Sequence, residues 1–100
     1  MDATSKALER LRAGYRAALP GKLDRIEALC STVGTPRAAS LPAAIYEAGQ
    51  VKGTAGTIGF NEVAQAMEAL ERALIAYREG GLTWEDIVAS LATARAAIDP

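Results

Sequence analysis

The 100-residue chain contains no histidine and only one cysteine, Cys30. Without histidine, the Ser/His and Cys/His arrangements of nucleophilic catalysis are absent. A single cysteine excludes an intramolecular disulfide, and zinc finds too few of its usual ligands. We therefore expect no cofactor, no metal site and no enzymatic activity. Cys30 is interpreted as a small hydrophobic residue near the end of a helix.

The sequence also lacks a basic stripe and a long apolar run. Its net charge is −1, with +2 over residues 1–50 and −3 over residues 51–100, whereas nucleic-acid-binding domains are usually basic. No uncharged run, residues 38–46 included, is longer than nine residues, and a membrane span needs about 20 apolar ones. The acidic start, "MDATSK", has no apolar core behind it, unlike a secretory signal. We expect a soluble cytoplasmic protein that binds neither nucleic acid nor membrane.

Aromatic residues, valine and isoleucine are few, while alanine and leucine dominate. This composition favours helices over strands. The length suits one domain, residues 1–100, with a single core. The sequence thus predicts a single all-α domain.

Apolar residues recur every three or four positions through the first third of the chain, which is typical of one face of a helix. Pro20 interrupts this pattern, because proline lacks an N–H and clashes with the preceding turn. We expect one helix over about 5–18 and a second over about 19–33, separated or kinked at Pro20. Gly34 is a plausible C-cap, and Ser40 a plausible N-cap for the next helix.

The third helix is expected to begin near Leu41, with Pro42 in its first turn, where a missing N–H costs nothing. Spacings of four and three predict a narrow apolar stripe facing the core. The stripe consists of Ala44, Ala48, Val51, Ala55 and Ile58. Gly59 suits the left-handed residue that ends the helix.

Two further helices follow. Asn61 is a good N-cap for the fourth, which the glycine pair at 80–81 ends. Thr83 is expected to cap the last helix, with Glu85 and Asp86 facing the positive end of its dipole. Short connections between these segments predict an up-down-up-down four-helix bundle with an additional N-terminal helix.

The stretch "AGQVKGTAGTIGF" places four glycines within thirteen residues of the third predicted helix. Within a helix, Gly49, Gly53 and Gly56 together cost about 2–3 kcal/mol relative to alanine. They fall, with Ile45 and Lys52, on a strip beside the core stripe, and we expect Gly49 and Lys52 to be exposed. Such a bare strip lets the backbone of a partner, or a phosphoryl group, approach closely.

The longer segment "AGQVKGTAGTIGFNEVAQAMEALERAL" resembles the central hairpin of histidine-containing phosphotransfer (HPt) domains, whose third helix typically reads A-H-x-L-K-G-S/T-A-G-x-x-G. The resemblance extends over about residues 15–97. The matching residues are Ala48, Lys52, Gly53, Thr54, Ala55, Gly56 and Gly59, with Val51 in place of leucine. Gly49 stands where the family carries its phosphorylated histidine, so the resemblance implies a member that cannot carry phosphohistidine.

The resemblance also implies roles for neighbouring residues. Lys52 corresponds to a charge partner of the phosphoryl group, and Gly53 to a residue that leaves room for a receiver domain. Gln50 and Tyr46 flank the strip. The candidate binding residues are Ile45, Tyr46, Gly49, Gln50, Lys52, Gly53 and Gly56.

The resulting hypothesis is an HPt-like domain of a two-component phosphorelay that docks response-regulator receiver domains or a histidine kinase without being phosphorylated. One alternative is a variant of an active phosphotransfer domain whose histidine was replaced at position 49. Another is a self-associating helical scaffold, although Lys52 would then face its own copy near a twofold axis. We expect a monomer, with a homodimer as the alternative.

Overall fold

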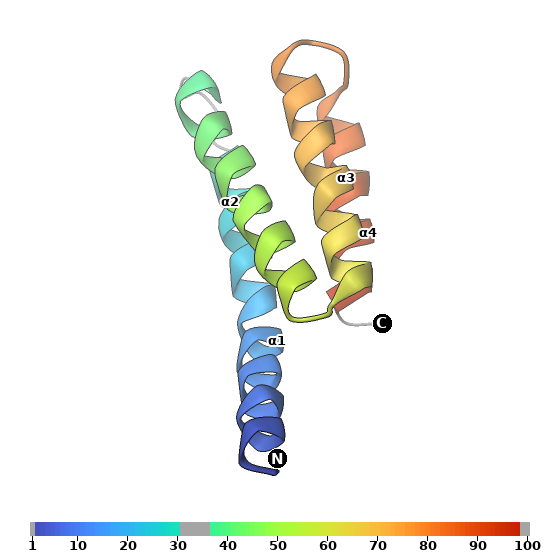
Figure 1. Ribbon diagram of the computed structural model, residues 1–100. Coiled ribbons are helices and arrows are strands. Elements are labelled where there is room, and N and C mark those ends of the chain that lie inside the picture. Colours follow the sequence, from blue (N-terminus) through green and yellow to red (C-terminus); the bar gives the residue numbers. More distant parts are fainter. Residues whose placement is uncertain (1, 31–36, 99–100) are drawn as a thin grey trace.

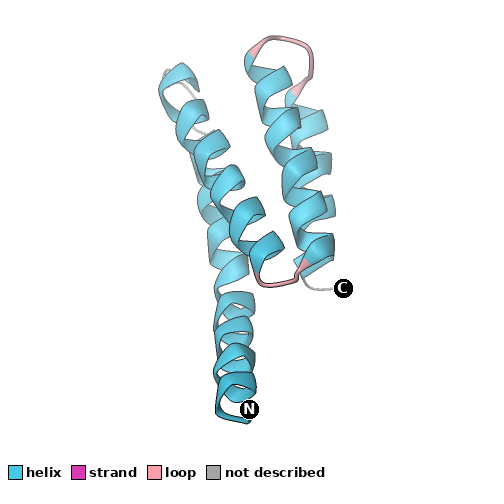
Figure 2. Cartoon of the chain, viewed as in Figure 1, coloured by secondary structure: helices cyan, strands magenta, loops and turns pink. Residues whose placement is uncertain are grey.

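The computed structural model describes residues 2–30 and 37–98, and it contains only helices and loops over these residues (Figure 2). The four helices are α1 (Asp2–Cys30), α2 (Arg37–Thr57), α3 (Asn61–Arg78) and α4 (Trp84–Ile98). Successive helices run in opposite directions, and α2 and α3 lie side by side (Figure 1). The predicted all-α, up-down-up-down four-helix bundle is confirmed.

The additional N-terminal helix is not seen, because α1 is one continuous helix that includes Pro20. Proline within a helix costs about 3 kcal/mol through the lost hydrogen bond and a clash with the preceding turn. Here Pro20 is solvent-exposed, while Leu19 and Leu23 beside it are buried in the core. Burying each such leucine contributes about 1.5–3 kcal/mol, enough to hold the helix through the proline.

The first half of α1 extends beyond the other helices (Figure 1), which makes the molecule 52 Å long but only about 20 Å wide. Leu8 and Leu11 remain 40% and 57% exposed. Arg12 Nε donates to the Ile58 carbonyl just past the end of α2 (2.8 Å), and Arg16 donates to the carbonyl of Ile98, the last residue of α4 (3.0 Å). The helices that cover α1 end at this level, so the apolar face of α1 that carries Leu8 and Leu11 is left uncovered.

The start of α2 differs from the sequence prediction. The helix begins at Arg37, so Ser40 lies inside it and is not its N-cap. Pro42 lies in the second turn rather than the first, again within the helix. The predicted C-cap at Gly34 lies outside the described residues.

The turn between α2 and α3 is set by Gly59, whose φ of +92° is the left-handed conformation that glycine adopts without strain. The Phe60 N–H donates to the Ala55 carbonyl (2.7 Å), and the Gly59 N–H donates to the Gly56 carbonyl (3.3 Å). These two bonds form the Schellman motif that closes a helix C-terminus. The prediction for Gly59 is confirmed, but Asn61 is already the first helical residue and Phe60 occupies the cap position.

Thr83 and Asp86 cap each other at the start of α4. The Asp86 N–H donates to Thr83 Oγ1 (3.3 Å), while the Thr83 N–H donates to Asp86 Oδ2 (2.8 Å). This reciprocal pair is a capping box with aspartate in the acidic position. The predicted cap of the last helix is therefore confirmed.

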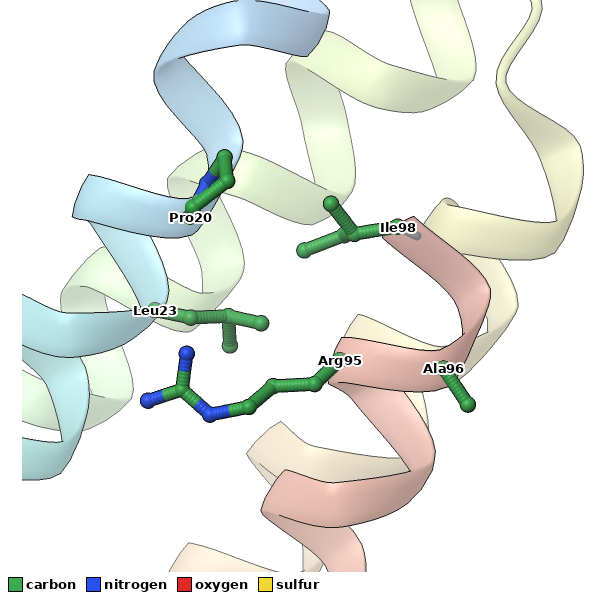
Figure 3. Close-up of a pocket in the computed structure, with 5 residues that line it drawn as sticks. All are labelled: Pro20, Leu23, Arg95, Ala96 and Ile98. Atoms are coloured by element: carbon green, nitrogen blue, oxygen red, sulfur yellow. The ribbon is translucent and has the colours of Figure 1, made fainter. Parts of the chain in front are cut away.

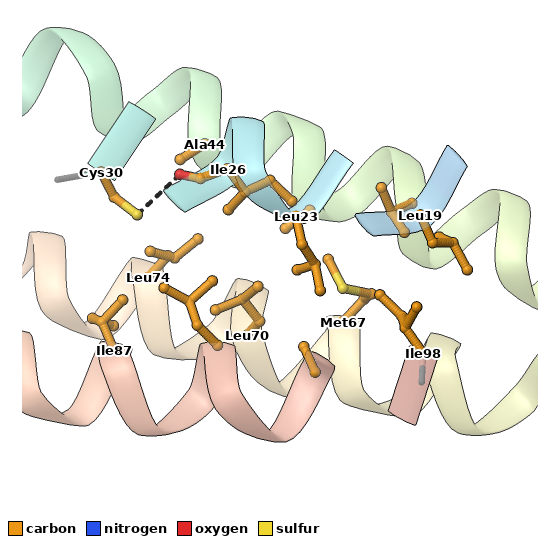
Figure 4. Close-up of a cluster of buried hydrophobic side chains, with 14 of the residues drawn as sticks. Leu19, Leu23, Ile26, Cys30, Ala44, Met67, Leu70, Leu74, Ile87 and Ile98 are labelled. Atoms are coloured by element: carbon orange, nitrogen blue, oxygen red, sulfur yellow. Dashed lines mark hydrogen bonds between the residues drawn. The ribbon is translucent and has the colours of Figure 1, made fainter. Parts of the chain in front are cut away.

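All four helices contribute side chains to one core (Figure 4). Leu19, Leu23 and Ile26 of α1 share this core with methionine and leucines of α3, while α2 contributes mainly alanines. Each residue of the predicted α2 stripe is buried: Ala44, Ala48, Val51, Ala55 and Ile58. Because small side chains let helices approach closely, α3 packs close to α2. The face of α2 that carries the glycines therefore lies next to α3.

Candidate functional site

The candidate site is the outward face of α2 that carries the exposed glycines. We call the five residues Gly49, Gln50, Lys52, Gly53 and Gly56 the glycine patch. Two open grooves border it. One, of about 340 Å³, is lined by Gly49, Gln50, Gly53, Thr54 and Thr57. The other, of about 460 Å³, lies between α2 and α3 and is lined by Lys52, Gly53, Gly56, Thr57, Ala64, Gln65 and Glu68.

The structure brings most of the predicted binding residues together. Gln50, Gly53 and Gly56 are exposed, as a docking surface requires. Ile45 is half-buried and packs against the core, whereas Tyr46 is 64% exposed. Neither Ile45 nor Tyr46 lines either groove, so both residues lie at the margin of the patch.

Gly49 and Lys52, which the sequence predicts to be exposed, are exposed only in part. Both are half-buried, because α3 packs beside them. The Lys52 ammonium donates to Glu71 Oε1 at 2.7 Å, and the two side chains are 37% and 21% exposed. Lys52 is therefore already paired within the chain.

The glycines of the patch differ in what surrounds them. A Cβ at Gly53 would meet nothing within 4 Å, and one at Gly56 would touch only the Ala64 methyl, at 3.9 Å. A Cβ at Gly49 would lie 2.8 Å from Glu71 Oε2, closer than van der Waals contact permits. The chain's own packing thus requires no glycine at position 53, while Glu71 occupies the space above position 49.

Sequence reasoning missed Glu71, although the hairpin register contains a signal for it. Residues equally far from Phe60 face each other across the α2–α3 turn. Gly56 and Ala64 are each four residues from it, Gly49 and Glu71 are each eleven residues away, and in both pairs a Cβ added to the glycine would point at its counterpart. Counting outward from the predicted turn would have placed an acidic residue opposite Gly49.

The chemistry that the patch offers is that of binding. Its groups are backbone, the Gln50 amide, hydroxyls and a paired ammonium, and the Thr57 hydroxyl donates to the Gly53 carbonyl (2.9 Å). Among residues 2–30 and 37–98, no three acidic or cysteine side chains gather where they could hold a metal ion.

A different cavity, of about 310 Å³, lies between α1 and α4 beside Pro20, Leu23 and Arg95 (Figure 3). Arg95 donates to Glu27 (2.6 Å) and Asp24 (2.9 Å), and these contacts raise the pKa of its guanidinium. Since both carboxylates come from α1, Arg95 ties α4 to α1. We interpret this cavity as part of the structural contact between α1 and α4.

The thiol of Cys30 is 2% exposed and donates to the Ile26 carbonyl at 3.0 Å (Figure 4). Burial raises the pKa of this thiol to about 11. Because the thiolate is the reactive form, Cys30 is inert near neutral pH, as a small core residue should be.

The family model of the Hpt domain matches residues 10–99, and the chain belongs to this family. Searches of curated proteins and of solved structures found no significant match. The resemblance inferred from the glycine motif is confirmed. That Gly49 takes the position of the family's histidine stays a prediction.

Hpt domains are phosphotransfer carriers of two-component signalling rather than enzymes in the usual sense, and they interact with histidine kinases and response regulators. Within the described part of this chain, no helix combines the length and apolar character needed to span a bilayer.

Proposed function

We propose that this domain docks response-regulator receiver domains or a histidine kinase through the glycine patch without carrying phosphohistidine. The statement that it carries no phosphohistidine rests on the absence of any histidine from the 100 residues. Its setting is the cytoplasm, where it sequesters or bridges components of a phosphorelay.

The open surface at Gly53 is the observation that supports docking. Glycine in a helix costs about 0.5–1 kcal/mol relative to alanine. Because a Cβ at position 53 would meet no atom within 4 Å in the part of the chain that the structure describes, internal packing does not explain the glycine. A partner whose backbone comes close to α2 does explain it.

Gly53→Gln tests docking, with Gly21→Gln as a matched control. Both glycines are exposed helical residues with open space around them, but Gly21 lies on α1, away from the patch. Across a panel of purified receiver domains and kinase domains, Gly53→Gln should weaken binding about tenfold or more, and Gly21→Gln should leave it unchanged. Equal affinities for both variants, or no binding to the wild-type chain, would refute docking at the patch.

The phosphorylation half is tested by incubating the chain with a phosphorylated receiver domain. The wild-type chain should acquire no acid-labile phosphate, since it has no imidazole to receive it. Stoichiometric phosphorylation of any residue would contradict the proposal.

Gly49→His tests whether the surroundings remain those of a phosphotransfer site. The new side chain displaces the Glu71 carboxylate, which lies at the end of a flexible side chain, and this frees Lys52 to stabilise a phosphoryl group. The variant should accept phosphate from a receiver, and adding Lys52→Ala should slow the transfer. A folded variant that stays inert with every receiver would show that the docking surface has diverged too, and would favour the self-associating scaffold over the phosphorelay.

Self-association through the patch is the second candidate. Two Lys52 side chains would face each other near the twofold axis of such a dimer. Their repulsion is weakened, because Glu71 neutralises Lys52 within each copy. Sedimentation across a concentration series separates the two functions: a dimer that Gly53→Gln dissociates favours a scaffold, and a monomer favours docking of other proteins.

A further inference from the structure

We propose that Glu71 sets the charge of the glycine patch: by holding Lys52 in an ion pair, it keeps anionic groups away and makes the patch selective for neutral partner surfaces. The statement about partners rests on the proposed docking function. The statement about anions concerns the chain alone and can be tested without any partner.

The geometry shows one carboxylate acting at two places. Glu71 reaches from α3 across to α2, where Oε1 accepts from the Lys52 ammonium at 2.7 Å. Its other oxygen, Oε2, lies 2.8 Å from where a Cβ of residue 49 would be. Glu71 therefore fills the space that Gly49 leaves open and neutralises the cation beside it.

The charges around the grooves make this pairing decisive. Lys52 is the one basic residue among those that line the two grooves, whereas Glu68 adds a negative charge at the rim. Glu68 is 51% exposed and lies 3.7 Å from Arg72 on its own helix. An anion that approaches the patch therefore competes with a carboxylate already in place and meets no free cation on the lining.

The partial burial of the pair strengthens the effect. Glu71 is 21% exposed and Lys52 is 37% exposed, so solvent screens their attraction less than it screens a surface pair. Gly53, Gln50 and the neighbouring hydroxyls are left as the accessible contacts. These groups suit an uncharged surface that supplies hydrogen-bonding groups and small side chains.

Glu71→Gln is the direct test, because it removes the charge and keeps the size of the side chain. The probe is inorganic phosphate, followed through the amide NMR signals of Gly53 and Thr54. Glu71→Gln should bind phosphate at the patch at least about threefold more tightly than the wild-type chain, the scale expected for one partly screened charge. Glu68→Gln, which removes a carboxylate from the groove between α2 and α3 without touching Lys52, should behave as wild type.

Lys52→Ala provides a second test, which does not depend on the Glu71→Gln variant alone. In the wild-type chain it should not strengthen phosphate binding, since it removes a cation that is already paired and leaves the Glu71 carboxylate in place, and in the Glu71→Gln background it should abolish the gain. Equal phosphate affinity in wild type and Glu71→Gln, or an equal gain in Glu68→Gln, would overturn the proposal.

Receiver binding separates this inference from the proposed function. If no receiver binds the wild-type chain, docking fails, while the phosphate result still decides the role of Glu71. If receivers bind the wild-type chain and phosphate affinity is the same in Glu71→Gln, docking stands and the charge proposal is wrong.

Discussion

Helix α2 carries two rows of small residues, and they are small for different reasons. Ala44, Ala48 and Ala55 are fully buried, and their small size lets α1 and α3 each pack close to α2. Gly53 and Gly56 are exposed on the other face. Small side chains within one helix thus serve internal packing on one face and leave an open surface on the other.

The comparison also divides the glycines themselves. Gly53 has open space around it, whereas Gly49 lies under the Glu71 carboxylate. Only the first is free of any constraint from the rest of the chain. We therefore propose that docking uses the end of the patch around Gly53 and that Glu71 controls the charge at the end around Gly49.

The largest effect is expected from enlarging the buried row. Ala48→Leu inserts three carbon atoms at a position with 0% exposure, and overpacking of this kind should lower the free energy of unfolding by about 3 kcal/mol. Urea denaturation measures the change. The matched variant Gly53→Leu, on the open row, should show no such loss, and equal losses at both positions would remove the distinction between the rows.

A pH dependence tests burial at another small core residue, Cys30. Its thiol has a folded-state pKa of about 11, raised from 9.0 by burial. Above pH 9 the unfolded chain releases this proton while the folded chain keeps it. Stability is therefore intact below pH 9 and falls by about 2–3 kcal/mol as the pH rises to 11.

Cys30→Ala isolates this contribution, because the lysines and tyrosines titrate equally in both proteins. The difference in unfolding free energy between wild type and Cys30→Ala should change by that amount between pH 9 and 11. A difference that stays constant would place the thiol in contact with solvent.

The smallest effect compares two exposed-face glycines. Gly53→Ala should raise the unfolding free energy by about 0.5–1 kcal/mol, because alanine is the better helix former and nothing obstructs its methyl group. Gly49→Ala should gain less, since its methyl group must displace Glu71 from Lys52. Adding Glu71→Ala should make the two substitutions equivalent, and a persistent difference would show that Glu71 is not the obstacle.

Much of the fold could be predicted because its signals are local. The period of the apolar residues, the left-handed turn at Gly59 and the cap at Thr83 each act within about one helical turn, and each is found in the structure. The predicted core stripe of α2 is buried for the same reason. The predictions that failed, a separate helix before Pro20 and a start of α2 near Leu41, applied local rules where packing or neighbouring helical residues decided.

The candidate site could be predicted only in part. The motif located Gly49, Lys52 and Gly53 on one face of α2, because helical spacing alone places them there. It did not reveal that Lys52 is paired, since its partner lies on another helix, nineteen residues along the chain. A sequence pattern within one helix carries no information on which side chain of the neighbouring helix comes within hydrogen-bonding distance.

The sequence by itself determined that this chain is helical, where three of its helices end or are capped, and that no imidazole is present. These properties follow from backbone preferences over a few residues and from composition. Tertiary structure alone decided that α1 continues through Pro20, that Leu8 and Leu11 stay uncovered, and that Glu71 lies over Gly49. Each depends on how far and at what rotation one helix packs against another, which the side chains of the whole core settle together.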